Sequence, residues 1–223
     1  MDDSKIFAFV DHTLLAPTTT WEDIAAICDD ALMFNCASVC IPPSFVKLAS
    51  RAYPALNICT VIGFPLGYSD TAAKVCEITK AIDDGASELD VVINIGDAKA
   101  GNFDKITAEL TALKKAAGDN ILKVIIECCY LTQDEKIALC KCVTDSGADY
   151  IKTSTGFGTG GATLDDIKLF RANIGPNVKI KAAGGMRTRE DFIMFINEGC
   201  SRLGTSSAVK VLVHSAGSSD GAY

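Results

Sequence analysis

This sequence lacks several signals that would place a protein in a class at once. No stretch approaches the roughly 18 consecutive apolar residues that a membrane-spanning helix needs. The opening residues MDDSKIFAFVDHTLL contain no apolar run of about 7–15 residues followed by a small-residue cleavage site, the pattern of a secretory signal. We therefore expect a cytoplasmic protein that does not enter a membrane.

Basic runs and basic amphipathic stripes are also missing. The chain carries a formal net charge of −7 and a pI near 4.8, which disfavours binding to nucleic acid or to an anionic membrane. The GxGxxG fingerprint of a Rossmann domain is absent too. The nearest match, the glycines at 156, 158, 160 and 161, has the wrong spacing. A small soluble ligand is the better expectation.

The ten cysteines form no C-x-x-C pair. The closest pairs are Cys36/Cys40, Cys128/Cys129 and Cys140/Cys142, and most cysteines stand in apolar runs. We interpret them as small core residues of a protein in a reducing compartment. A redox role for an exposed cysteine stays open, as does the alternative of a cysteine-rich redox or zinc protein, which metal analysis and thiol counting would test.

Strand-like runs alternate with amphipathic helical segments along the whole chain. Helical patterns such as 22–34 and 104–117 fall between the strands, and Thr132 with Glu135 forms a capping-box signal. Alternating strands and helices indicate parallel βα units. With 48% hydrophobic residues and no low-complexity linker, we predict a single-domain α/β protein, a (β/α)₈ TIM barrel over residues 1–214 with a flexible tail over 215–223. The eight predicted strands lie near 8–13, 37–41, 58–63, 88–93, 122–127, 149–154, 179–183 and 201–205.

A weak internal repeat places chemistry on these strands. Three units run from a glycine and a small residue to an aliphatic residue, and the next position is Asp90, Lys152 or Gly204. These positions belong to predicted strands four, six and eight, and alternate strands of a barrel contribute to the same interior layer. Lys181 is on strand seven and should enter beside Lys152 from an adjacent layer.

Two lysines inside buried strands require a reason, because an ammonium group is almost never buried without a partner. A free lysine, with a pKa of ~10.4, is almost wholly protonated at neutral pH. A second ammonium about 5 Å away disfavours that charge by about 3 kcal/mol at an effective dielectric of ~20. Lys152 beside Lys181 therefore indicates a Schiff-base amine, with Asp90 relaying protons. Alternatively, the lysines reach solvent from strand ends and Asp90 is only their salt-bridge partner.

Glycines and hydroxyls after the last two strands predict an anion site. Gly184 and Gly185 end strand seven, while Gly204, Ser206 and Ser207 lead from strand eight into a helix. Free backbone N–H groups, hydroxyls and a helix dipole at these loops form the usual phosphate site of a barrel. The alternative is ordinary turn glycines with a serine N-cap. Together the two segments favour a phosphorylated substrate.

Seven segments of the sequence together form a family pattern: VDHTLL (10–15), SVCIPP (38–43), ELDVVINIG (88–96), LKVIIE (122–127), YIKTSTGF (150–157), KIKAAGGMRT (179–188) and RLGTSS (202–207). Through these segments, from about Ile6 to Val211, the sequence closely resembles the deoxyribose-phosphate aldolase family. The resemblance implies a class I aldolase on a TIM barrel, with no metal or organic cofactor. It would reversibly cleave 2-deoxy-D-ribose 5-phosphate to acetaldehyde and D-glyceraldehyde 3-phosphate in deoxyribose catabolism, as a homodimer or larger oligomer.

The resemblance also implies roles for individual residues. Lys152 matches the Schiff-base lysine, Lys181 the lysine that perturbs it and transfers protons, and Asp90 the acid/base carboxylate. The matching phosphate positions are Gly156, Gly184, Gly185, Gly204, Ser206 and Ser207, and the positions expected nearer the sugar are Asp11, Thr13, Cys40 and Thr155. Phe157 stands where some relatives carry lysine, so one phosphate contact is in doubt.

Two alternative functions and one open question about the tail remain at this point. A transaldolase-like or keto-acid aldolase would share the Schiff-base lysine, and dependence on acetaldehyde would separate it. A catalytically silent barrel that binds a phosphorylated ligand would fail imine trapping. For the tail, we expect either a passive end or a segment that folds across the barrel mouth and brings the Tyr223 hydroxyl to the imine as a proton shuttle.

Overall fold

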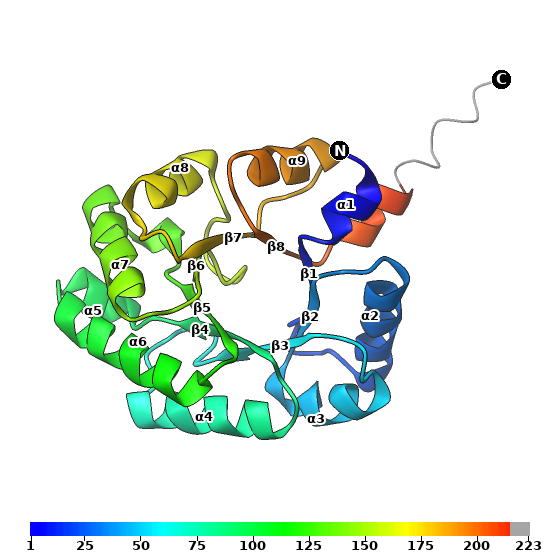
Figure 1. Cartoon of the computed structure of the whole chain (residues 1–223), viewed down its shortest axis with the longest axis horizontal. Coiled ribbons are helices and arrows are strands. Elements are labelled where there is room, and N and C mark those ends of the chain that lie inside the picture. The colour runs from blue at the N-terminus through cyan, green and yellow to red at the C-terminus, as the bar shows by residue number, and fades with distance from the viewer. Residues whose placement is uncertain (215–223) are drawn as a thin grey trace.

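The computed structural model describes residues 1–214, which form a closed barrel of eight parallel strands surrounded by helices (Figure 1). Each strand pairs with the next along the chain, and β8 closes the barrel against β1. The predicted (β/α)₈ barrel is confirmed. The tail at 215–223, with Tyr223, lies outside the described residues, so its role stays a prediction. The strands are β1 (Val10–Thr13), β2 (Ser38–Ile41), β3 (Ile58–Ile62), β4 (Glu88–Val92), β5 (Ile121–Ile125), β6 (Tyr150–Lys152), β7 (Lys179–Ala183) and β8 (Arg202–Thr205).

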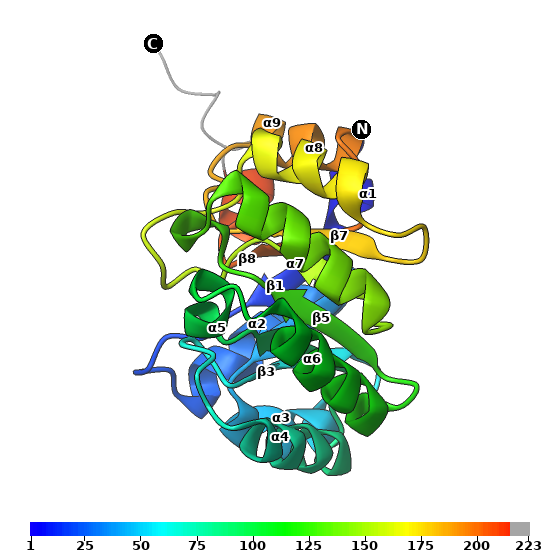
Figure 2. The ribbon, with the colours of Figure 1, turned by 90° about the vertical axis from the view of Figure 1, so that its left-hand side faces the viewer.

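The helices lie outside the strands, and those from α4 to α8 pack side by side along one flank (Figure 2). None of the helices within residues 1–214 combines the length and the apolar character that crossing a bilayer requires. The helices are α1 (Asp3–Phe7), α2 (Trp21–Met33), α3 (Pro43–Ala52), α4 (Thr71–Asp83), α5 (Ile95–Lys99), α6 (Phe103–Ala117), α7 (Gln133–Asp145), α8 (Leu164–Asn173) and α9 (Arg189–Asn197), with a 3₁₀ turn at Cys128–Tyr130 and a π-helical segment at Lys210–His214.

Side-chain caps start the helices where the sequence predicts them. The Thr132 hydroxyl accepts the N–H of Glu135, and the Glu135 carboxylate accepts the N–H of Thr132 at 2.7 Å. Thr188 forms the same reciprocal pair with Asp191 at the start of α9. Such caps satisfy backbone donors that the first helical turn leaves free. They fix where each strand-to-helix loop ends, and these loops carry the site.

Two short helices were not predicted. Helices α1 and α5 have five residues each, too few for an apolar periodicity to stand out. Because α1 ends with Ala8 as its C-cap, strand β1 begins at Val10 rather than at the predicted residue 8. Strand β6 is likewise shorter than predicted, ending at Lys152, and the chain beyond it forms a cavity wall.

Apolar packing is divided between two regions of the barrel. The large core lies between the outer face of the sheet and the helices. A small cluster of Cys40, Cys59 and Val61 is separate from it, with Leu15 and Phe64 packed against it. The buried charged side chains of the strands occupy the rest of the barrel interior. Seven of the ten cysteines are buried, which confirms their interpretation as core residues.

Candidate active site

The floor of the site is a buried network of ion pairs. It joins four cationic side chains to three carboxylates: Lys123, Lys152, Lys181 and Arg202 with Asp11, Glu88 and Asp90. All seven come from strands, and only Arg202 among them is more than a few per cent exposed. A charge buried in a protein is stable only when it is paired and hydrogen-bonded, and this network meets that condition.

Asp90 on β4 is the centre of the network. Its Oδ2 accepts hydrogen bonds from Lys152 Nζ and Lys181 Nζ, each at 2.7 Å. Its Oδ1 accepts from Lys123 Nζ at 2.9 Å. Burial raises the pKa of Asp90, but the three ammonium groups outweigh burial and hold it well below the usual range. In the resting protein Asp90 is thus a carboxylate that can accept a proton.

Lys181 on β7 is stabilised as a cation by two carboxylates. It is fully buried, is the Cα partner of Lys152 on β6, and pairs with the carboxylates of both Asp11 and Asp90. Burial alone would lower the pKa of Lys181, and the two carboxylates reverse that effect and raise it. The predicted proximity of the two lysines is confirmed. The electrostatics differ from the sequence-based estimate, because Asp90 lies between the ammonium groups and attracts both.

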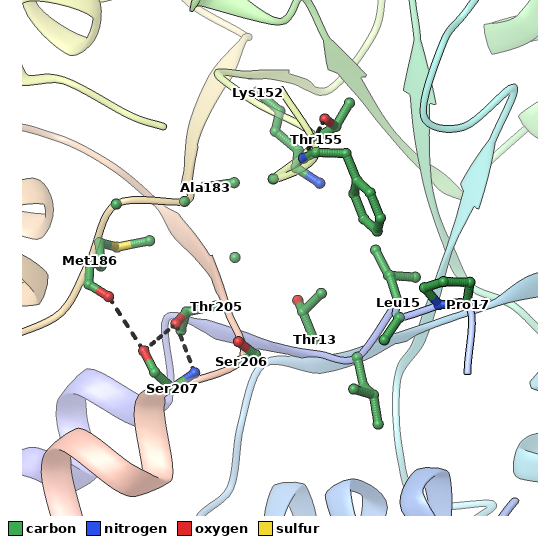
Figure 3. A pocket seen from close by; sticks show the side chains of 17 residues that line it. Thr13, Leu15, Pro17, Lys152, Thr155, Ala183, Met186, Thr205, Ser206 and Ser207 are labelled. Atoms are coloured by element: carbon green, nitrogen blue, oxygen red, sulfur yellow. Dashed lines mark hydrogen bonds between the residues drawn. The ribbon is translucent and has the colours of Figure 1, made fainter. Parts of the chain in front are cut away.

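Lys152 is the one lysine of the network that reaches the cavity above it. Its side chain is 4% exposed, it has a single carboxylate partner, and Figure 3 shows its amine directed into the open space. Lys181 and Lys123 each contact two or more carboxylates and line no part of this cavity. A substrate carbonyl can therefore meet Lys152 and none of the other amines of the network.

The cavity has a volume of about 420 Å³ and opens at the carboxyl ends of the strands. Nine of the predicted site residues line it: Thr13, Lys152, Thr155, Gly156, Gly184, Gly185, Gly204, Ser206 and Ser207. Asp90 and Lys181 lie directly beneath the cavity, where they form ion pairs within the network. Asp11 and Cys40, expected near the sugar, are fully buried and do not line the cavity.

One wall of the cavity consists of glycine backbone and hydroxyl groups. Gly184 and Gly185 have φ angles of +74° and +81°, which a residue with a Cβ rarely adopts. A Cβ on Gly204 would lie 3.0 Å from Lys181 Cε, so a glycine there leaves room for that lysine. Ser207 donates its N–H to the Thr205 hydroxyl at 3.0 Å and its own hydroxyl to the Met186 carbonyl (Figure 3). This polar wall suits an anion.

The opposite wall is apolar. Leu15 and Pro17 line it on the far side of the cavity from Met186 and Ser207 (Figure 3). Phe157 also lines the cavity and is 52% exposed, with its ring edge-on to that of Phe64 at a centroid distance of 5.3 Å. Lys152 is the only lysine or arginine among the residues that line this cavity within the described part of the chain. The polar wall therefore relies on N–H and hydroxyl donors rather than on a side-chain cation.

The sequence analysis missed the carboxylate that holds the loop after β6. Glu127 follows β5 with a φ of +55°, uncommon for a residue with a side chain, and it is 2% exposed. Its two oxygens accept the N–H of Thr155 at 3.2 and 3.3 Å and also the Thr155 hydroxyl. The Thr155 hydroxyl in turn accepts the N–H of Phe157 at 3.0 Å. Glu127 thus fixes the Thr155–Phe157 loop against the cavity.

Lys123, Glu88 and Arg202 were also missed as members of the network. Each is a charged residue inside a predicted strand, the same signal that pointed to Lys152 and Lys181. If every charged residue inside a predicted strand had been considered, Lys123 would have been found as well. It is fully buried and lies 2.7 Å from Glu88. Arg202 pairs with both oxygens of Glu88 at 2.8 and 2.9 Å.

The fold agrees with the comparisons with known proteins. A sequence profile of the DeoC/LacD family of aldolases matches residues 5–218, so the chain belongs to this family and is a carbon–carbon lyase. The relatives it resembles are deoxyribose-phosphate aldolases. The one from Clostridium botulinum is 61% identical over 95% of this chain and 96% of its own, and the one from Clostridioides difficile is 58% identical over 93% and 95%.

Solved structures show the same relationship. The deoxyribose phosphate aldolase from Aeropyrum pernix, described as a unique tetrameric structure, matches with a TM-score of 0.90 and 29% identity over 97% of this chain and 93% of that one. An aldolase called QR15 matches with a TM-score of 0.90 and 34% identity, over 95% and 96% of the two chains. The whole barrel is therefore shared with these structures.

Proposed function

We propose that the protein is a Schiff-base aldolase that reversibly cleaves 2-deoxy-D-ribose 5-phosphate to acetaldehyde and D-glyceraldehyde 3-phosphate. The observation that carries this proposal is the single amine of Lys152 in the cavity floor, 2.7 Å from the buried Asp90 carboxylate. The family and the relatives' names support the substrate. The assignment of roles to residues rests on the geometry.

The pairing pattern of the network makes Lys152 the amine that is available as the nucleophile. Four cations face three carboxylates, so loss of one proton leaves three ion-paired cations and no net charge in the floor. Lys152 has the fewest carboxylate partners among the four and is the one that reaches substrate. Its proton can pass to a water or to the departing carbinolamine hydroxyl.

The chemical steps follow from these positions. Neutral Lys152 Nζ attacks the C1 aldehyde of the open-chain sugar, and the carbinolamine loses water to give an iminium. The iminium withdraws the electrons of the C2–C3 bond while a base removes the C3 hydroxyl proton, so glyceraldehyde 3-phosphate leaves and an enamine remains. Protonation at C2 and hydrolysis then release acetaldehyde. The Asp90 carboxylate, the Lys181 ammonium and a water are the proton carriers that the floor can offer.

The substrate's phosphate would occupy the polar wall opposite Leu15 and Pro17. Gly184, Gly185 and Gly204 let the backbone approach an anion closely, and the hydroxyls of Ser206 and Ser207 lie beside them. An anion bound by uncharged donors in a partly enclosed site gains short, charge-assisted hydrogen bonds. The C1 aldehyde of a five-carbon chain then lies near Lys152.

Borohydride trapping tests the proposal. With acetaldehyde and a hydride reductant, Lys152 should gain a two-carbon ethyl group, found by mass spectrometry of its peptide. Lys179, exposed on the neighbouring strand β7, is the matched internal control and should remain unmodified. Labelling of many lysines without preference for Lys152 would contradict the mechanism. Trapping by pyruvate or dihydroxyacetone in place of acetaldehyde would favour a keto-acid or transaldolase-like enzyme.

We also infer a homodimer or larger oligomer that acts in the cytoplasm on deoxyribose derived from nucleosides. The tetrameric description of the Aeropyrum pernix relative supports the oligomer. Light scattering of the purified full-length chain measures the mass of the assembly, and a mass of a single chain of 23.5 kDa would contradict the inference.

A further inference from the structure

Two cysteines face each other inside the barrel, beneath the cavity. Cys40 on β2 and Cys59 on β3 are direct Cα partners on neighbouring parallel strands. Both are fully buried, and they belong to the small interior cluster with Val61 rather than to the main core. The aldolase steps described above use neither thiol.

Asp90 supplies a third donor to this pair. The Cys59 thiol donates to Asp90 Oδ1 at 3.2 Å, and one donor atom from each of Cys40, Cys59 and Asp90 lies within 4.8 Å of the others. A tetrahedral cation with metal–sulfur bonds of about 2.3 Å and metal–oxygen bonds of about 2.1 Å needs donors roughly 3.6–3.8 Å apart. Small side-chain rotations therefore bring the three donors to a shared ion.

Lys123 donates to Cys59 Sγ at 3.2 Å, so a metal that takes both sulfur atoms must displace that donor as well as the thiol protons. Burial, with Cys40 and Asp90 beside it, raises the pKa of the Cys59 thiol, so its proton leaves only as the metal binds. Binding of a divalent cation with release of both thiol protons would leave the total charge of the floor unchanged, because two positive charges leave and two arrive. The nearby lysines therefore do not forbid the ion.

The cavity lies beside these donors. Thr13, which lines the cavity, is the Cα partner of Cys40, and Leu15 both lines the cavity and packs against the cysteine cluster. Lys152 lies over Asp90 at the cavity floor. A cation bound to Cys59 would take Asp90 Oδ1, which the Cys59 thiol and Lys123 now contact, and would leave Oδ2 to Lys152.

We propose that Cys40, Cys59 and Asp90 form an inhibitory site for one thiophilic divalent cation, such as Zn²⁺ or Cd²⁺. Binding joins the metal to both sulfur atoms and to Asp90 and releases two protons to solvent. With Oδ1 on the metal, the Asp90 carboxylate offers less negative charge to Lys152 and Lys181 at Oδ2 and is a weaker proton acceptor, so imine formation and carbon–carbon cleavage slow together.

Cadmium ion is the probe, used on the reduced full-length enzyme after removal of metals by dialysis. Equilibrium dialysis should give one tight Cd²⁺ per chain, and an ultraviolet sulfur-to-cadmium absorption band should rise in proportion. At a free Cd²⁺ concentration ten times the measured dissociation constant, acetaldehyde release followed by NMR should fall about elevenfold. EDTA should restore the rate and abolish the band.

Cys59→Ala and Cys40→Ala should each lose the tight site, the band and the sensitivity of the rate to Cd²⁺. Cys76→Ala is the matched control, because Cys76 is exposed on α4, and it should behave as the wild type. The proposal is overturned if Cys59→Ala binds and is inhibited like the wild type, or if tight binding leaves the rate unchanged. Equilibrium dialysis and the absorption band measure metal binding whether or not the protein is an aldolase. A failure of the aldolase assignment would therefore be seen separately from a failure of the metal site.

Discussion

Replacing Lys123 by methionine should destabilise the protein strongly, although Lys123 touches no part of the cavity. Its ammonium lies 2.7 Å from Glu88, 2.9 Å from Asp90 and 3.5 Å from Asp11, and the side chain is fully buried. Methionine preserves most of the volume but leaves three buried carboxylates with one cation fewer. Removing one partner of a buried ion pair costs about 3–5 kcal/mol in the free energy of unfolding.

The expected change in melting temperature follows from that figure. In a chain of this size each kcal/mol shifts Tm by about 2–4 °C, so Lys123→Met should lower Tm by roughly 6–20 °C. Differential scanning calorimetry at neutral pH measures the shift. Lys80→Met is the matched control, because the Lys80 side chain of the Lys80–Asp84 pair is 64% exposed, and its Tm should stay close to that of the wild type.

A second substitution separates the loss of ion pairing from the loss of packing. Glu88→Gln removes the carboxylate nearest to Lys123, so Lys123→Met/Glu88→Gln should recover part of the Tm lost by Lys123→Met alone. If Lys123→Met melts like the wild type, the floor network is not held by charge pairing. If the double variant is less stable than the sum of both single changes predicts, the buried carboxylates are not the source of the loss.

Three further predictions concern the loop, the acid limit and metal removal. Glu127→Gln should raise KM for the phosphorylated sugar more than it lowers kcat, because it replaces an acceptor of the Thr155 hydrogen bonds that fix the loop. A rise in KM no larger than the fall in kcat would contradict a positioning role for Glu127. The pKa of Asp90 lies below its ordinary value of 3.8. Its contribution to the stability of the fold is therefore complete above pH 3.8 and is lost as the pH falls through the folded-state pKa. In urea unfolding between about pH 2 and 7, the stability of Asp90→Asn should thus depend less on acid than that of the wild type. EDTA should leave the rate of the metal-free enzyme unchanged, because the iminium serves as the electron sink; a loss restored by Zn²⁺ would contradict the Schiff-base mechanism.

The barrel could be predicted from the sequence because its signals are local. Each strand is a short apolar run, each helix has its own periodicity, and threonines such as Thr132 mark helix starts. The meeting of Asp90, Lys152 and Lys181 followed from the layering of alternate strands, a rule that needs only strand order. These features require no knowledge of side-chain conformation.

The partners of each charge could not be predicted in the same way. The register between strands determines that Asp90 faces Lys123, and a shift of one residue would turn these side chains to opposite faces. Without that register, the sequence analysis placed Lys181 beside Lys152 as a repelling charge. The hydrogen bonds from Thr155 to Glu127 depend on a φ of +55° at Glu127, and no residue pattern around Glu127 predicts that conformation.

Ion pairs rather than apolar packing position the reactive amine in this barrel, and this affects how the site can work. The Lys152 amine donates to the Asp90 carboxylate, which also accepts from Lys123 at Oδ1 and from Lys181 at Oδ2. Asp90 therefore stays in place when Lys152 leaves it to bond carbon. Lys181 remains paired to Asp11 at that moment, so the iminium forms above a floor whose other charges are already satisfied. Reorganisation around the new bond is then limited to Lys152 and the substrate, which is the condition under which preorganised charge lowers a barrier.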